Sequence, residues 1–110
     1  MNKQRILAGM RSSGTLHLGN YLGGLKGMLA LQDDPKYETY YMVADLHALT
    51  TPYDKTELAE STKNVIKDYL AAGLDPQKSV IFVQSQVPEQ VELAYYFLLL
   101  ALLFLPIWLM

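Results

Sequence analysis

The sequence is organised around a run that begins with a turn rich in Gly and Ser, follows a short apolar segment and leads into a segment with helical spacing. The run extends from Gly9 to Gly23, and residues 6–8 before it are apolar and few enough to form a buried strand. Leucines then recur with helical spacing, at Leu18, Leu22, Leu25 and Leu29. A helix that starts just after a strand presents free N–H groups and the positive end of its dipole to the space above that strand. This order therefore predicts a nucleotide-phosphate site at the carboxyl end of the first strand.

A simpler interpretation of the same run remains open. Ser and Gly are ordinary turn residues, and a single His at the start of a helix is often only a cap. The run is not a Walker loop, because no Gly-Lys-Ser/Thr follows it, and it lacks the Gly-x-Gly-x-x-Gly of dinucleotide sites. From the residues alone, phosphate binding and simple capping are both compatible with this turn.

The rest of the chain alternates between strand-like and helix-like segments. We expect strands at residues 3–10, 38–44 and 79–84, and helices at 17–31, from 54 to 73 and from 88 onward. Asp54 and Glu57 have the spacing of a capping box, and Gly73 is placed to end that helix. The segment 45–53 is expected to be a loop. This alternation predicts an α/β fold with a parallel sheet.

Two helical patterns add detail to this expectation. One face of the helix from 54 to 73 is apolar, formed by Leu58, Thr62, Val65, Ile66 and Tyr69. In the first helix, Gly19, Gly23 and Gly27 recur every four residues, and each costs about 1 kcal/mol relative to Ala in a helix interior. We therefore expect Gly23 and Gly27 to pack tightly on the sheet.

Composition excludes several classes of site. A chain of 110 residues is at most one domain, and its net charge of −2 gives no sequence-wide attraction for nucleic acid. It contains no Cys, so disulfides and thiolate metal sites are excluded. The first residues do not have the pattern of a signal peptide, and a cytoplasmic location is therefore the expectation.

The last part of the chain differs from the rest. Every charged residue lies at or before Glu92, and residues 93–110 are apolar. We expect two units, a partial catalytic domain at 1–92 and a helical tail at 93–110. Eighteen apolar residues are near the lower limit of about 17–25 for crossing a bilayer, Pro106 interrupts them, and no Lys or Arg follows. Membrane contact through the tail is therefore a weaker alternative to an association surface.

Three motifs together resemble one family. His17-Leu18-Gly19-Asn20 resembles the His-Ile-Gly-His signature of class I aminoacyl-tRNA synthetases, in the variant with Asn last. Its surroundings, Ser-Gly-x-Leu-His-Leu-Gly-Asn-Tyr-Leu-Gly, are similar to bacterial tryptophanyl-tRNA synthetases. The runs at 45–50 and 73–89 resemble segments that follow in that family in the same order. The resemblance covers residues 1 to about 93 and implies the first half of a Rossmann-type nucleotide-binding domain.

The resemblance also implies a reaction. Family members join tryptophan to ATP, which arrives with Mg²⁺, and then transfer the tryptophanyl group from the adenylate to tRNA. The nucleophile is the carboxylate of the substrate, so catalysis needs positioning and stabilisation of phosphoryl charge more than a general base. Family members are homodimers. A resident metal site is not expected, because Zn²⁺ needs three or four convergent ligands.

By resemblance, the turn holds ATP and the second strand lines the amino-acid pocket. The implied catalytic residues are His17, which can donate to the phosphates, and Asn20. The implied ATP contacts are Arg11, Ser12, Ser13, Gly19 and Asn20, with adenine approaching Gly19. The implied tryptophan contacts are Leu7, Met42, Ala44 and His47. Two alternatives remain open at this stage, namely that His17 only caps its helix, and that Asp45 caps a turn while His47 packs.

Several family features are absent from these residues. The Lys-Met-Ser-Lys-Ser-like loop, the acidic side chain that reads the indole nitrogen, the anticodon-binding domain and most of the dimer interface do not occur in the sequence. We therefore expect a truncated, frame-shifted or deliberately shortened form of a longer protein. A small nucleotidyltransferase with a His-x-Gly-His turn is the second hypothesis, and a non-catalytic module that binds adenine nucleotide or a membrane is the third. Tyrosyl-tRNA synthetases are the relatives most easily confused with this sequence.

Overall fold

A three-stranded parallel sheet forms the centre of the protein. The structure is a computed structural model that describes residues 2–12, 16–52 and 54–109, with the side chains of these residues except 55 and 105–109. The strands are β1 (Gln4–Arg11), β2 (Tyr37–Ala44) and β3 (Val80–Val83), in the order β1-β2-β3. Both neighbouring pairs are parallel. The predicted α/β fold with a parallel sheet is confirmed.

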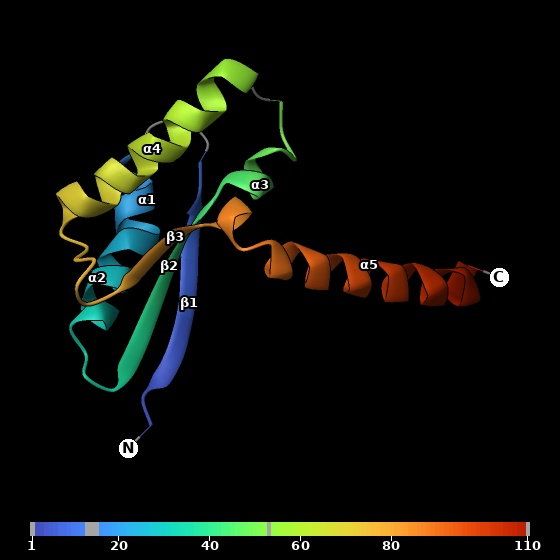
Figure 1. Cartoon of the computed structure of the whole chain (residues 1–110), viewed down its shortest axis with the longest axis horizontal. Helices are drawn as coiled ribbons and strands as arrows, with labels where there is room; N and C mark the ends of the chain where they lie inside the picture. The colour runs from blue at the N-terminus through green and yellow to red at the C-terminus, as the bar shows by residue number, and fades with distance from the viewer. Residues whose placement is uncertain (1, 13–15, 53, 110) are drawn as a thin grey trace.

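The longer helices that connect the strands lie on one face of the sheet (Figure 1). The first connection consists of α1 (Leu18–Asn20), the π-helical η1 (Tyr21–Leu25) and α2 (Lys26–Gln32). The second contains α3 (Asp45–Ala48) and α4 (Lys55–Ala72). The core lies between these helices and the sheet, and its buried members are Leu25, Met28, Tyr41, Val43, Val65, Tyr69 and Leu74.

Helix α4 follows its sequence pattern closely. The Asp54 carboxylate accepts a hydrogen bond from the Thr56 amide at 2.7 Å and so caps the first turn. The helix ends at Gly73, whose φ of 109° lies in the left-handed region that favours glycine. On the predicted apolar face, Val65 and Tyr69 are fully buried. The expected face, N-cap residue and end of this helix are confirmed, but the cap is a bond to Thr56 and not the expected box with Glu57.

The first helix differs from the prediction in its middle. A helix at 17–31 was expected, whereas the structure has helical residues from 18 to 32 with a π-helical segment at Tyr21–Leu25. The expectation for Gly23 and Gly27 is wrong, because a Cβ on either glycine would meet nothing within 4 Å. The close contact is at Gly24, where a Cβ would lie 2.8 Å from the terminal methyl carbon of Met10. The tight packing against β1 therefore occurs beside the predicted positions.

Two boundaries also differ from the expectation. Residues 45–48 of the expected loop form the short helix α3, which begins directly where β2 ends. The third strand is shorter than predicted, because residues 84–86 turn into the 3₁₀ helix η2 (Gln84–Gln86). Both short helices lie at the carboxyl edge of the sheet, so they add backbone to the place where the site was predicted.

Helix α5 (Pro88–Leu109) extends away from the sheet (Figure 1). It starts at the expected proline and passes residue 92 without a break, so the division into units at 1–92 and 93–110 stays a prediction. Its large apolar side chains are exposed, namely Val91, Leu93, Tyr95, Tyr96, Phe97, Leu98, Leu99, Leu100, Leu102, Leu103 and Phe104. Among the described residues, no helix is both long enough and apolar enough to span a membrane.

Candidate functional site

The turn after β1 holds a buried hydroxyl. Arg11 is the last residue of β1 and is exposed, whereas Ser12 is only 3% exposed. The Ser12 Oγ atom is buried and has no hydrogen-bond partner among the described residues. Ser13, another predicted ATP contact, lies outside the described residues. A hydroxyl without a partner at the end of a strand is a donor that a bound phosphate could use.

His17 and Asn20 cap the helix that follows. The Nδ1 atom of His17 accepts a hydrogen bond from the Gly19 amide at 3.1 Å, and the His17 amide donates to the Asn20 Oδ1 at 3.0 Å. This reciprocal pair is a capping box, so the capping interpretation of His17 is observed. Because Nδ1 accepts, the neutral ring carries its proton on Nε2, and the ring is exposed. His17 can therefore cap the helix through Nδ1 and still donate to a phosphate through Nε2.

Gly19 makes room for the ring that caps the helix. A Cβ at this position would lie 3.0 Å from both Cε1 and Nδ1 of His17. In this structure the group nearest to the missing side chain is thus the imidazole of His17. The approach of adenine to Gly19 stays a prediction.

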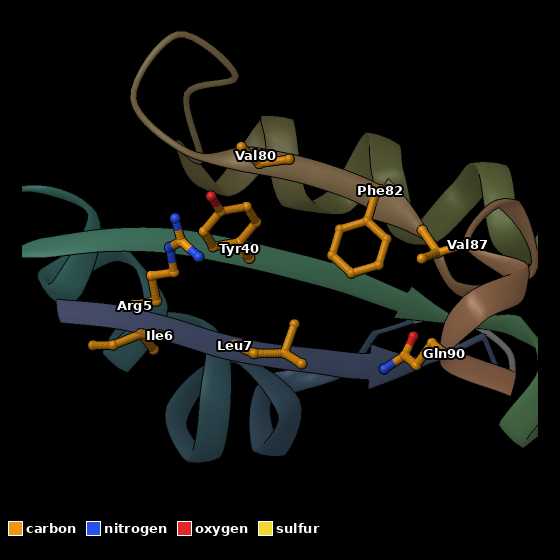
Figure 2. Close-up of a pocket in the computed structure, with 8 residues that line it drawn as sticks. All are labelled: Arg5, Ile6, Leu7, Tyr40, Val80, Phe82, Val87 and Gln90. Carbon is orange, nitrogen blue, oxygen red and sulfur yellow. The ribbon is translucent and has the colours of Figure 1, made fainter. Parts of the chain in front are cut away.

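Three of the four predicted tryptophan contacts, Leu7, Met42 and Ala44, lie on the face of the sheet opposite the helices. The register pairs Leu7 with Tyr40 and Arg11 with Ala44, and Met42 lies between them on the same face of β2. A cavity of about 580 Å³ hollows this face (Figure 2), and its lining residues are Arg5, Ile6, Leu7, Tyr40, Val80, Phe82, Val87 and Gln90. It includes Leu7 but neither Met42 nor Ala44, so the structure brings only part of the predicted set to one cavity.

Polar groups lie at the amino end of this cavity. The Arg5 Nε atom lies 3.1 Å from Glu38 Oε2, and the Tyr40 hydroxyl donates to Glu38 Oε1 at 2.9 Å. The Tyr40 hydroxyl and the Arg5 guanidinium together hold the pKa of the Glu38 carboxyl below its usual value. The rest of the lining is mainly apolar, which suits the side chain of a large apolar amino acid.

His47 belongs to a second, smaller hollow. This hollow, of about 320 Å³, is lined by Leu46, His47, Thr50, Gln84, Gln90, Val91 and Ala94. The His47 amide donates to the Gln84 side chain at 3.3 Å, while Asp45 Oδ1 accepts from the amides of Leu46 at 2.9 Å and Ser85 at 3.0 Å. Asp45 thus joins the end of β2 to η2, whereas α3 has no side-chain cap and His47 is exposed, so the alternative of a capping Asp45 and a packed His47 is not observed.

Gln90 is the residue that sequence reasoning missed. It lines both hollows, and its Oε1 atom is buried without a hydrogen-bond partner among the described residues. No motif in the sequence marks it, because its position depends on how α5 leaves the sheet. Within the described part of the chain, no group of three or more His, Asp or Glu residues could hold a metal ion.

Comparison with known proteins places these features in one family. The family model of class I tRNA synthetases (W and Y) matches residues 1–104. The chain is 48% identical over 99 residues to a tryptophan–tRNA ligase of Streptococcus pneumoniae, and 51% identical over 94 residues to that of Thermotoga maritima. These alignments cover 89% and 84% of the chain but only 29% and 28% of the two relatives.

A solved structure gives the same result. The tryptophanyl-tRNA synthetase of Campylobacter jejuni complexed with ADP and tryptophan matches with a TM-score of 0.75 and 38% sequence identity. The match covers 84% of this chain and 28% of that one. The chain therefore spans less than a third of the length of the relatives that it matches.

Proposed function

The chain belongs to the class I tRNA synthetases (W and Y), and on that premise we propose that it is the part of a tryptophan–tRNA ligase that binds ATP and tryptophan. The observation that carries this proposal is the Ser12 hydroxyl, which directly follows β1 and is buried without a hydrogen-bond partner among the described residues. His17, which caps the helix that follows, supports it. Both lie at the carboxyl edge of the parallel sheet, where α/β folds bind their ligands.

We assign the phosphates of ATP, with the Mg²⁺ that accompanies them, to this turn. Ser12 Oγ and the Nε2 proton of His17 would donate to phosphate oxygens, and Arg11 would add a positive charge. Asn20 would act by holding the first turn through its bond to the His17 amide. Ser13 and Gly19 complete the assigned ATP contacts. Tryptophan would lie against Leu7, Met42 and Ala44, with His47 near its edge.

The proposed reaction is the activation step of the family. An oxygen of the tryptophan carboxylate attacks the α-phosphorus of ATP, a new carboxylate–phosphorus bond forms, and pyrophosphate leaves with the electrons of the broken bond. The carboxylate is already ionised at neutral pH, so no proton must be removed. The contribution of this chain is to hold the two substrates in line and to donate hydrogen bonds to the charge that develops.

The whole family role extends beyond these residues. We assign tRNA as the acceptor of the tryptophanyl group, a cytoplasmic location and a homodimer to that role. Because the chain spans less than a third of its relatives, we expect weak ligase activity from these residues alone. Ligand binding is therefore the direct test.

The test is a titration of the isotope-labelled protein with MgATP, followed by amide NMR. We expect the amides of Ser12, Gly19 and Asn20 to shift first, and added tryptophan to shift Leu7 and Ala44. Prior tryptophan should tighten ATP binding if both lie at one site, whereas a nucleotidyltransferase that does not use tryptophan would show no such effect. Shifts confined to α4 or α5 would contradict the proposal.

A further inference from the structure

Tyr69 joins the neighbouring strands β1 and β2 through its hydroxyl group. This residue lies on α4, and its side chain is fully buried. The hydroxyl accepts a hydrogen bond from the Met10 amide at 2.9 Å and donates one to the Met42 carbonyl oxygen at 3.1 Å. A helix side chain thus bonds the backbones of β1 and β2 at the same point.

The two bonded atoms are those that a regular ladder would join directly. In a parallel pair, one strand donates to its neighbour from every second residue. The Gln4 amide donates to the Lys36 carbonyl at 2.9 Å, one position before its partner Tyr37. If this donor–acceptor spacing continues along β1 in steps of two residues, the Met10 amide is the donor that faces the Met42 carbonyl. The Tyr69 hydroxyl bonds both of these groups.

A second residue is adapted to the same carbonyl group. A Cβ on Gly9 would lie 2.5 Å from the Met42 carbonyl oxygen, which is closer than real Cβ contacts allow. Only glycine lets β1 come so near to this oxygen. Gly9 and Tyr69, from different elements, therefore both set the geometry of β1 against β2 at Met42.

The two halves of the candidate site begin immediately after this point. After Met10 the chain reaches the end of β1 at Arg11 and continues to Ser12, and shortly after Met42 it reaches the end of β2 at Ala44 and continues to Asp45. We propose that Tyr69 is a positioning residue whose hydroxyl fixes the ends of β1 and β2 relative to each other, and hence the phosphate turn relative to the amino-acid side. This inference rests on the proposed function for what the two strand ends hold.

The protonation of Tyr69 supports a fixed role. Burial raises the pKa of Tyr69 to about 12. The hydroxyl therefore keeps its proton across the neutral range and donates to Met42 at any working pH. Because the group does not titrate there, its effect on the site is geometric.

The chain offers a matched control for the test. Tyr41 is also fully buried, and its hydroxyl donates to a backbone carbonyl, that of Met28, at 2.6 Å. Tyr69→Phe and Tyr41→Phe each remove one buried hydroxyl, so both should lower the denaturation midpoint. Only Tyr69→Phe should displace the strand ends, and we expect it to weaken ATP binding by about tenfold, because small misplacements are costly at such sites. Tyr41→Phe should leave the ATP affinity unchanged.

NMR of the same variants identifies the cause. In Tyr69→Phe, amide shift changes should concentrate at residues 10–12 and 42–45, and the Met10 amide should exchange faster with solvent. An ATP affinity that is unchanged in Tyr69→Phe, or equally lowered in Tyr41→Phe, would overturn the inference while the proposed function stands. If the unmodified chain bound no ATP, the proposed function would fail and the inference with it.

A measurement on the unmodified chain decides the case in which Tyr69→Phe does not fold. With tyrosine labelled at the Cζ carbon, saturation with MgATP and tryptophan should shift the resonance of Tyr69 and leave that of Tyr41 in place. Ligand binding without any change at Tyr69 would overturn the inference.

Discussion

The Nδ1 atom of His17 lies 3.1 Å from the amide nitrogen of Gly19 and accepts its hydrogen bond. This bond caps the helix and also leaves the proton of the neutral ring on Nε2. The signature histidine therefore has a structural role that is visible without any ligand, and the proposed donation to phosphate uses its other nitrogen. A substitution that keeps the capping acceptor but removes the Nε2 donor can therefore test the two roles independently.

We predict different effects of His17→Asn and His17→Ala. Asparagine is a strong N-cap residue, so His17→Asn should retain the stability of the unmodified chain, whereas His17→Ala should lose about 1 kcal/mol. Both variants lack the Nε2 donor and should bind ATP more weakly. Urea unfolding and ATP titration measure the two effects. Unchanged ATP binding in His17→Asn would mean that His17 is only a cap.

Ser12 and Ser79 form a second informative pair. Both are buried, but the Ser79 hydroxyl lies 2.7 Å from the Thr39 hydroxyl, while Ser12 Oγ has no hydrogen-bond partner among the described residues. We expect Ser12→Ala to weaken ATP binding with little change in stability. Ser79→Ala should do the reverse and cost about 1 kcal/mol. A large loss of stability in Ser12→Ala would show that its hydroxyl serves the fold.

The glycines give a prediction about packing. Gly9→Ala would place a Cβ 2.5 Å from a backbone oxygen, and such overpacking should cost about 1–3 kcal/mol. Gly27→Ala, in α2, meets nothing within 4 Å and should stabilise the chain by about 1 kcal/mol through better helix propensity. Thermal unfolding of the two variants provides the comparison. Equal effects would contradict the assignment of the close approach to Gly9.

The parts of the fold that the sequence predicted are those set by local chemistry. Helix α4 has its N-cap residue, apolar face and terminating glycine within its own sequence, and all three are confirmed. The placement of Met42 and Ala44 on one face of β2 likewise follows from the alternation of side chains along a strand. For such features, no knowledge of distant neighbours is needed.

The features that the sequence did not predict depend on contacts between distant residues. The spacing of Gly23 and Gly27 indicated close packing, but the methyl group of Met10 meets the helix at Gly24 instead. The cavity over Leu7 and Phe82 and the position of Gln90 depend on where α5 starts relative to the sheet. The bonds of Tyr69 to both strands likewise become visible only in three dimensions.

Alkaline pH gives the last prediction, again through Tyr69. Its pKa is raised from the usual 10.0 to about 12 by burial, so the unfolded state loses this proton at lower pH than the folded state. The stabilisation that depends on the protonated hydroxyl is therefore fully present below about pH 10 and is lost as the pH rises towards about 12. Urea unfolding at a series of pH values above 9 should show this decline in free energy. In Tyr69→Phe the decline should be shallower but still present, because the pKa values of three other tyrosines are also raised. Burial raises the pKa of Tyr41, and hydrogen bonds to carboxylates raise those of Tyr40 and Tyr96. Curves of equal slope for the two proteins would contradict the buried, hydrogen-bonded state of the Tyr69 hydroxyl.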